Sequence, residues 1–156
     1  MCCHCAFVYT QTSYRRLEDL EYYFPLLDAE QAAEILALFP VGYFLLRRSG
    51  NPFAACTVSV RTNKHVMNMR IFSSRTSDGW AGTTFYLDTP EKEMRVQFED
   101  VPALLRHYMY SRKRILPVGE NEDRFETDHF FLDQPVTGKM VVSSSVGWGE
   151  ERRKSN

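Results

Sequence analysis

The sequence predicts an α+β fold in which a central antiparallel sheet is flanked by two helices. Apolar residues recur at helical spacing in two segments, residues 28–40 and 100–109. Between these segments, three stretches alternate apolar and polar residues with a period of two. Only short turns join the three stretches, and connections of that length pair neighbouring strands antiparallel. One more short helix, over residues 13–23, is expected ahead of the sheet.

Composition limits the classes of function. A chain of 156 residues with 44% apolar and 25% charged side chains fits a single globular domain. Because the net charge is −1 and the charges are interspersed, no broad basic face is expected, which argues against nucleic acid as a partner. No stretch reaches the roughly 18 apolar residues of a membrane span, and no secretory signal is visible, so we expect a cytoplasmic chain.

Residues 1–12 are expected to form a flexible tail that contains three of the four cysteines, Cys2, Cys3 and Cys5. Adjacent ligands without a distant second pair do not readily close a tetrahedron, so no metal site and no cofactor are predicted. Clustered terminal cysteines also suit acylation, which would allow a weak tether to the inner membrane surface. No disulfide framework is visible.

The first elements follow from local patterns. Leu17, Leu20 and Phe24 lie at helical spacing and predict a short amphipathic helix over residues 13–23. Asp28 is then a candidate N-cap with Gln31 three residues later. The helix that follows carries one apolar stripe and ends before Pro40; the stripe consists of Ala32, Ile35, Leu36 and Phe39.

Strands are predicted over residues 43–48, 54–61 and 66–72, with turns at 50–52 and 62–64. Alternation of side chains puts Leu45 and Arg47 on one face of the first strand and Phe44 and Leu46 on the other. In the same way Thr57 and Ser59 share a face of the second strand, and Asn68 and Arg70 share a face of the third.

The second half of the chain predicts fewer elements. Residues 73–83 are interpreted as a loop, and residues 84–87 as a short strand. Asp100 caps a second helix whose apolar positions are Val101, Leu104, Leu105 and Tyr108. Residues 112–128 are charged and expected to be mobile, residues 130–132 are a candidate closing strand, and residues 137–156 are interpreted as a polar tail.

Arg47 indicates that the chain binds an anion, because it is an ionised side chain inside an otherwise apolar strand. Burying a charge costs several kcal/mol unless an opposite charge meets it. Arginine is shaped for two-pronged contact with phosphate, and Arg47, Ser49, Thr57 and Arg70 could converge on one face. Charge-assisted hydrogen bonds of about 1.5 to 3 kcal/mol each would favour a phosphorylated ligand by roughly a thousandfold. A structural ion pair, or an edge strand from which Arg47 reaches water, remains an alternative.

The segment Gly42-Tyr43-Phe44-Leu45-Leu46-Arg47-Arg48-Ser49 resembles the phosphotyrosine-binding signature of Src-homology-2 domains. The resemblance extends through residues 57–61 and 68–71, and through Phe-x-x-Val-x-x-Leu-x-x-His-Tyr-Met at 98–109, so that it covers most of residues 17–135. Within this family the chain is most similar to the suppressors of cytokine signalling, in the spacing of Arg47, Thr57 and the Asn-x-Arg-Ile segment that contains Arg70. Residues 131–135 resemble the closing strand of their domain.

The resemblance implies that residues 13–136 form such a domain with an N-terminal helical extension. It assigns the phosphate contact to Arg47, with Ser49, the Gly50 amide, Thr57, Asn68 and Arg70 completing the site. An apolar surface for the residues after the phosphotyrosine would be formed by Met69, Leu87, Leu105 and Tyr108. The implied function is non-enzymatic: the domain attenuates cytokine receptor or JAK-STAT-type signalling by occupying tyrosine-phosphorylated receptor or kinase peptides.

Three departures from the family pattern qualify this prediction. Arg48 stands where the family has an acidic residue, and it adds positive charge to the loop. Ala29 stands where kinase-type members have a further arginine, so that the site would depend more on Arg70. Residues 136–156 do not resemble the C-terminal box that recruits elongins and a ubiquitin ligase, and this recruitment is therefore not expected.

Two other classes of function are alternatives. The chain could be a Src-homology-2 adaptor of another lineage, or a degenerate module that has lost phosphate affinity through Arg48 and Ala29. It could also be a cysteine phosphatase, because Cys56 precedes Arg61. The phosphatase loop needs five residues between cysteine and arginine, whereas four intervene here and alternate like a strand.

Overall fold

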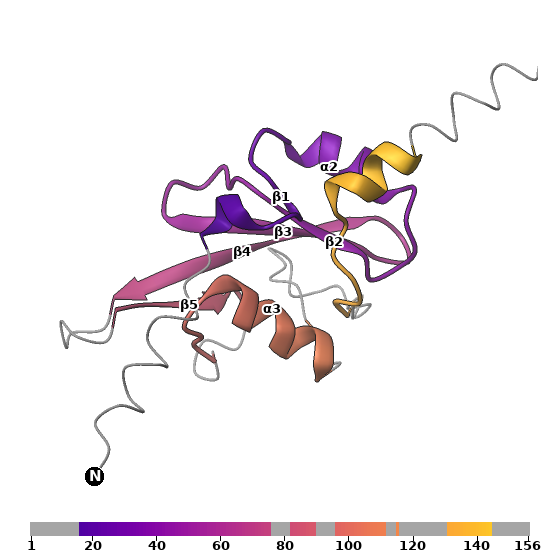
Figure 1. Ribbon diagram of the computed structural model, residues 1–156. Coiled ribbons are helices and arrows are strands. Elements are labelled where there is room, and N and C mark those ends of the chain that lie inside the picture. Colours follow the sequence, from indigo (N-terminus) through magenta and orange to yellow (C-terminus); the bar gives the residue numbers. More distant parts are fainter. Residues whose placement is uncertain (1–15, 76–81, 90–95, 112–114, 116–130, 145–156) are drawn as a thin grey trace, which may run out of the picture.

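The computed structural model describes residues 16–75, 82–89, 96–111, 115 and 131–144 (Figure 1). Within these ranges, five strands form one sheet in the order β1-β2-β3-β4-β5. β1 runs parallel to β2, and the other pairs are antiparallel. The elements are η1 (Leu17–Asp19), β1 (Tyr23–Phe24), α2 (Ala29–Leu36), β2 (Phe44–Arg47), β3 (Ala54–Arg61), β4 (Val66–Arg75), β5 (Thr83–Leu87) and α3 (Val101–Tyr110).

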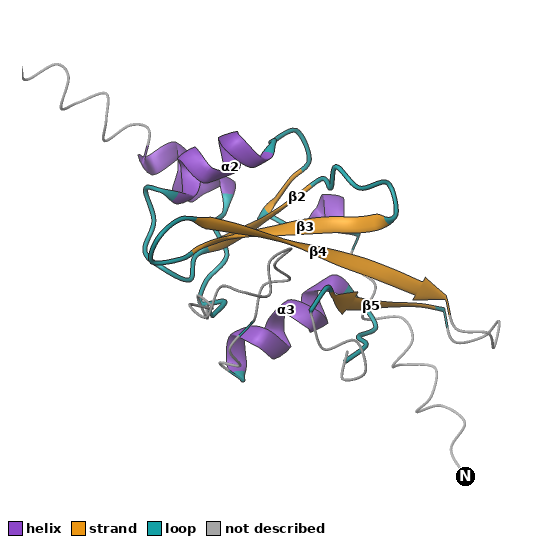
Figure 2. Ribbon diagram, turned by 180° about the vertical axis from the view of Figure 1, so that it is seen from behind, coloured by secondary structure: helices purple, strands orange, loops and turns teal. Residues whose placement is uncertain are grey.

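The sheet lies between two helical layers, which confirms the predicted α+β fold. α2 and a helix of residues 138–144 lie on one side of the sheet, and α3 lies on the other (Figures 1 and 2). β3 has the predicted bounds. β4 is three residues longer than predicted because its end pairs with β5, from Ile71 opposite Leu87 to Arg75 opposite Thr83.

Both predicted helix caps are present. The Asp28 carboxylate accepts a hydrogen bond from the Gln31 amide at 2.8 Å, and the Gln31 side chain accepts one from the Asp28 amide at 3.0 Å. The Asp100 carboxylate accepts from the Ala103 amide at 2.7 Å. Caps of this kind contribute about 1 kcal/mol each and fix where each helix begins.

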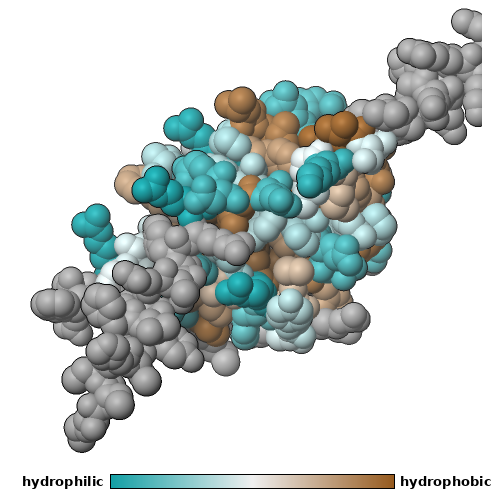
Figure 3. Space-filling model, in the orientation of Figure 1, coloured by the Kyte–Doolittle hydropathy of each residue, from teal (hydrophilic) through white to brown (hydrophobic). Residues whose placement is uncertain are grey.

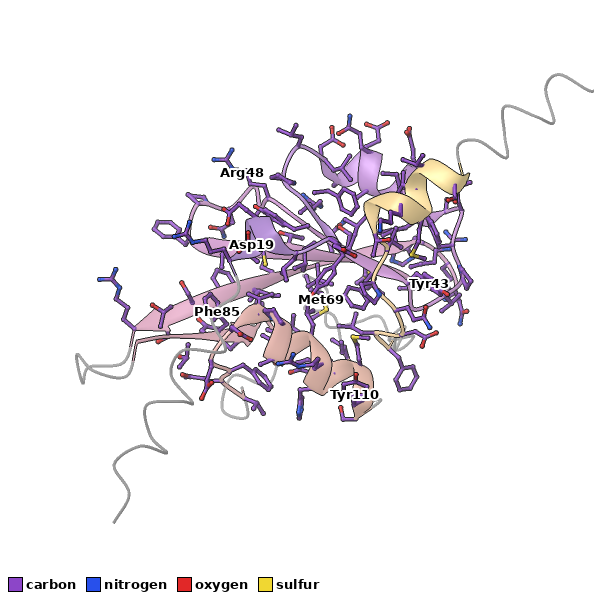
Figure 4. All side chains as sticks on the ribbon, viewed as in Figure 1. Asp19, Tyr43, Arg48, Met69, Phe85 and Tyr110 are labelled. Atoms are coloured by element: carbon purple, nitrogen blue, oxygen red, sulfur yellow. The ribbon has the colours of Figure 1, made fainter. Side chains whose placement is uncertain are left out.

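The two faces of the sheet contribute to two separate apolar clusters, as the alternation predicts. Phe44 and Leu46 of β2 pack with the α3 side, whereas Leu45 between them packs with Ala32 and Leu36 of α2. Figure 4 shows Met69 and Phe85 between the sheet and α3. Arg47 therefore shares the α2 side with Leu45.

The N-terminal segment differs from the prediction. Residues 1–15 lie outside the described part of the chain, and a single 3-10 turn at Leu17–Asp19 stands where a helix to Tyr23 was expected. Tyr23 and Phe24 are extended and pair with Leu46 and Arg47. The Leu46 amide donates to the Tyr22 carbonyl at 2.9 Å. Tyr23 and Phe24 thus form a strand because they pair with the free edge of β2. The spacing of residues within the segment does not reveal a pairing partner that lies elsewhere in the chain.

The C-terminal segment also differs. The pattern predicted a closing strand at residues 130–132, whereas the family resemblance placed it at residues 131–135. The pairing with β2 agrees with the second range: the Phe44 amide donates to the Gln134 carbonyl at 3.0 Å, and the Val136 amide donates to the Phe44 carbonyl at 2.7 Å. The predicted polar tail then begins with helical residues 138–144. Val136 is fully buried and Val141 packs against the same α2 cluster, so this segment is part of the packed domain. Residues 112–114 and 116–130 lie outside the described part.

Gly42 allows this C-terminal segment to approach the sheet. Its φ is +93°, and a Cβ atom added there would lie 2.8 Å from the Cβ of Asp133. The Gly42 amide donates to the Arg61 carbonyl at 2.8 Å, and its carbonyl accepts from the Asp133 amide at 2.9 Å. A side chain at this position would disturb both the backbone and the contact.

Candidate functional site

Three polar side chains form a row across the centre of the sheet. Arg47 of β2 lies opposite Thr57 of β3, and Thr57 lies opposite Arg70 of β4. Directly opposed residues of antiparallel strands project from the same face. The two arginines therefore lie on the α2 side of the sheet, on either side of one threonine.

Arg47 is nearly buried, with 9% of its surface exposed. Its Nε donates to Ser59 Oγ at 3.0 Å, one terminal nitrogen donates to Asn68 Oδ1 at 3.3 Å, and the other makes a long contact of 3.4 Å with the Arg48 carbonyl. All three acceptors are neutral. Of the five N–H groups of a guanidinium, one on each terminal nitrogen remains for a ligand.

Burial lowers the pKa of Arg47, and the nearby carboxylate of Asp28 partly opposes this effect. A guanidinium nevertheless stays protonated in proteins, so the site holds a positive charge that has lost much of its water. Such a charge is stabilised when an anion meets it. The site is suited to an anion with several oxygen atoms.

Arg47 lines a cleft of about 940 Å³, to which α2 contributes Ala29 and β4 contributes residues 67–70. Thr57 is buried at 4% exposure, whereas Arg70 is exposed. The lining residues that the sequence analysis assigned to the phosphate site are Arg47, Ser49, Gly50, Thr57, Asn68 and Arg70. The structure therefore brings all six together.

The loop between β2 and β3 forms one wall of this cleft. Ser49 Oγ accepts a hydrogen bond from the Asn51 amide at 3.1 Å, and Asn51 Oδ1 accepts one from the Phe53 amide at 2.9 Å. The Ala54 amide closes the loop onto the Asn51 carbonyl at 3.1 Å. These local bonds hold Ser49 and Gly50 beside the strand that carries Arg47.

A family model of the SH2 domain matches residues 22–108, which include the whole row and the loop. The chain belongs to the SH2 domain family. Members of this family are non-catalytic modules that bind phosphotyrosine peptides. The resemblance noted from the signature around Arg47 is thereby confirmed.

Among its curated relatives, this SH2 chain is similar to the cytokine-inducible SH2-containing proteins of Gallus gallus, at 33% identity, and of Bos taurus, at 31%, each over 97 residues. These relatives match the predicted resemblance to the suppressors of cytokine signalling. The alignment covers 61% of this chain in both cases, and 36% and 35% of the two relatives. The chain thus spans about a third of the length of these relatives.

Solved structures support the same fold. CED-2 has a TM-score of 0.52 and 24% identity over 74% of this chain and 60% of its own. The SH2 domain of the Monosiga brevicollis CRK/CRKL homologue has a TM-score of 0.51 and 21% identity over 82% of this chain and 97% of its own.

The residues predicted to form an apolar peptide-binding surface are mostly buried in the core of this SH2 domain. Met69 lines the cleft at 5% exposure. Leu87, Leu105 and Tyr108 have exposures of 2%, 1% and 6%, and they pack with Met69 in the α3-side core. Side chains this deeply buried offer little surface to a peptide. In the described part of the chain they stabilise the core, and a direct contact with ligand is not supported.

Arg48 does not line the cleft. It is exposed at the end of β2, and Figure 4 shows its side chain directed outward. The pKa of Tyr23 is raised, mainly by burial, and the positive charge of Arg48 opposes part of this rise. Arg48 contributes to the site through its carbonyl group, which contacts Arg47.

Two residues of the site were missed in the sequence. Ser59 was assigned to the correct face, but its bond to Arg47 depends on the register between β2 and β3. Phe53 lines the cleft from the loop and is 82% exposed. The position of a large apolar residue directly after a predicted turn was the available signal for Phe53.

Cys56 is not suited to be a phosphatase nucleophile. It is fully buried and belongs to the α3-side core, on the opposite face from Arg47. Burial raises its pKa to about 12, so the thiolate form that attacks phosphate is not populated near neutral pH. The phosphatase alternative therefore lacks its nucleophile at this position.

Among the described residues, no group of three or more His, Cys, Asp or Glu side chains could hold a metal ion. No helix in the same ranges has the length and hydropathy to cross a membrane. Cys2, Cys3 and Cys5, considered above as a membrane tether, lie outside the described residues.

Proposed function

We propose that this chain binds tyrosine-phosphorylated peptides and that Arg47 receives the phosphate. The observation that carries the proposal is the environment of Arg47: a nearly buried guanidinium, oriented by neutral acceptors, that lines an open cleft. A phosphate dianion would supply the negative charge that the three hydrogen-bond acceptors of Arg47 lack. Two parallel bonds from the free terminal N–H groups would also match phosphate geometry.

The surrounding residues complete the proposed receptor. Ser49 and Gly50 offer a hydroxyl and an amide from the loop, and Thr57 offers a hydroxyl between the two arginines. Arg70 approaches from the exposed end of the row. Because Ala29 contributes no charge from α2, Arg70 is the second cation of the lining. Its contribution is therefore expected to be large.

At the level of the cell, we propose that the chain attenuates cytokine or JAK-STAT-type signalling by occupying phosphorylated receptor or kinase tails in the cytoplasm. Support comes from the relatives, which are cytokine-inducible SH2-containing proteins. A bound module blocks other recruits by occupying the same phosphotyrosine. No chemical step is required of the chain.

Calorimetry of the full chain with one receptor-tail peptide in phosphorylated and plain form tests the proposal. The phosphorylated peptide should bind at least about a hundredfold more tightly, as expected for two or more charge-assisted bonds. Arg47→Lys should remove most of this difference, since an ammonium cannot make the two-pronged contact. Arg48→Lys is the matched control, because its side chain lies outside the cleft lining.

Equal binding of the two peptide forms by the wild-type chain would refute the proposal and identify a degenerate module. An Arg47→Lys variant with wild-type affinity would refute the assignment of the phosphate contact. For the cellular role, a cytokine-driven transcriptional reporter should be repressed by the wild-type chain and not by Arg47→Lys. Equal repression by both would contradict a mechanism that depends on phosphotyrosine.

A further inference from the structure

Phe53 is a large apolar side chain in an unusual place. It is 82% exposed, yet it lies in the loop that forms one wall of the cleft. It is also the one aromatic residue among the described residues that line this cleft. A single exposed apolar residue needs no explanation by itself, but one at the rim of a charged cleft faces whatever enters it.

Local hydrogen bonds set the position of Phe53 relative to the proposed phosphate ligands. Its amide donates to Asn51 Oδ1 at 2.9 Å, and the Asn51 amide donates to Ser49 Oγ at 3.1 Å. Asn51 therefore connects the backbone of Phe53 to the hydroxyl of Ser49. An ordered loop of this kind presents the ring without a large entropic cost on binding.

Arg47 and Phe53 lie at different depths in the cleft, which indicates different roles for the two side chains. Arg47 is 9% exposed and lies on the floor formed by the sheet, whereas Phe53 is 82% exposed and lies at the rim. When the phosphate of a ligand binds Arg47, the atoms that carry the phosphate lie near the rim of the cleft. For phosphotyrosine those atoms form an aromatic ring, and for phosphoserine they are a short aliphatic link.

The residue that α2 contributes to the cleft offers little to such a ring. Ala29, the first residue of α2, lines the same cleft with a single methyl group. It supplies neither a cation nor an apolar plane for a ring to stack on. Phe53 is thus the one described lining side chain that can form an aromatic pair with such a ring.

Building on the proposed function, we propose that Phe53 packs against the tyrosyl ring and makes the site selective for phosphate carried on an aromatic ring. Arg47 then recognises the phosphate, and Phe53 recognises its carrier. Aromatic pairs and the accompanying burial of apolar area should change affinity about tenfold, which corresponds to about 1.4 kcal/mol. Phe53 is a specificity residue in this scheme and does not contribute to charge recognition.

The test compares phenyl phosphate with inorganic phosphate, by NMR titration of the full chain and of its Phe53→Ala, Phe53→Leu and Phe53→Tyr variants. Phe53→Ala should weaken phenyl phosphate about tenfold and leave inorganic phosphate unchanged. Phe53→Tyr should retain the wild-type preference, and Phe53→Leu should fall between the two. Because the side chain is exposed, the melting temperature should stay the same in all variants.

Leu26 provides a matched control. It is 93% exposed and does not line the cleft, so Leu26→Ala should affect neither ligand. An equal loss for both ligands, or no loss for phenyl phosphate, in Phe53→Ala would overturn the proposal. Binding to vesicles of phosphatidylserine and phosphatidylcholine tests the alternative that Phe53 contacts a membrane. If vesicle binding falls in Phe53→Ala while phenyl phosphate binding does not, the ring serves a membrane and the proposal is wrong.

The two proposals fail in different ways. If the proposed function is wrong, the wild-type chain will bind neither phosphate ligand and will not prefer the phosphorylated peptide over the plain one. If only the inference about Phe53 is wrong, the wild-type chain will bind phosphorylated peptide in a manner that depends on Arg47, with the same affinity in Phe53→Ala.

Discussion

The Nε atom of Arg47 donates a hydrogen bond to Oγ of Ser59, 3.0 Å away on the neighbouring strand. Ser59 is fully buried and in turn donates to Asn68 Oδ1 at 2.6 Å. Asn68 Oδ1 also accepts from a terminal nitrogen of Arg47 at 3.3 Å. The guanidinium is thus oriented from β3 and β4 through neutral groups, which hold it without cancelling its charge.

Asn68→Asp should weaken phosphopeptide binding without lowering the stability of the fold. The change keeps the shape of the side chain but puts a carboxylate in place of the oxygen 3.3 Å from Arg47. The new charge would pair with Arg47 and repel a phosphate, at a cost of about 1 to 2 kcal/mol or roughly tenfold in affinity. The melting temperature should not fall. Calorimetry with a phosphotyrosine peptide and a thermal melt measure the two effects, and undiminished affinity would contradict the geometry assigned to Arg47.

Arg70→Ala should weaken phosphopeptide binding by about tenfold or more, because it removes the second cation of the cleft. Its side chain is exposed, so the free energy of unfolding should change by less than about 0.5 kcal/mol. Arg75→Ala serves as control: Arg75 is exposed on the same strand but lies outside the cleft. Equal losses in the two variants would indicate a general charge effect and not a specific contact.

Gly42→Ala should destabilise the fold without touching the site. At a φ of +93°, with Asp133 only 2.8 Å from the added atom, the variant should lose about 1 to 3 kcal/mol of unfolding free energy. Gly50→Ala is the matched control, because a Cβ there meets nothing within 4 Å. Urea denaturation compares the two. A Gly42→Ala variant as stable as Gly50→Ala would argue against the close approach of the C-terminal segment.

Cys56 should make stability fall at alkaline pH. In the folded chain burial raises its pKa from 9.0 to about 12, so between these values the unfolded chain releases a proton that the folded chain keeps. The unfolding free energy should therefore decrease with rising pH across this window, by up to about 1.4 kcal/mol per pH unit. Denaturation at several pH values in wild type and Cys56→Ala measures this contribution. Identical slopes in the two proteins would contradict the raised pKa.

The parts of the fold that could be predicted are those with local causes. Asp28 and Asp100 cap the helices at the expected positions, because a cap and the amides it accepts from lie within one turn. The face assigned to Arg47 was also correct, because alternation along a strand requires no knowledge of its neighbours. The six residues that the family resemblance assigned to the phosphate site all line one cleft.

The parts that could not be predicted depend on partners distant in the chain. A helix was predicted over residues 13–23 because Leu17, Leu20 and Phe24 lie at helical spacing, but Tyr23 and Phe24 pair with the free edge of β2 as a strand. Leu105 was assigned to a ligand surface, although its helical stripe is covered by the sheet and leaves it 1% exposed. Helical spacing indicates an apolar face and does not say what covers that face.

By itself, the sequence determined the class of fold, the helix caps and the side of the sheet on which Arg47 and Arg70 lie, because each follows from repeats and caps within a few residues. Only the tertiary structure decided that Ser59 and Asn68 orient Arg47 and that Phe53 stands at the rim of its cleft. The register between strands and the depth of a cleft are set by packing over the whole sheet, and no short segment encodes them.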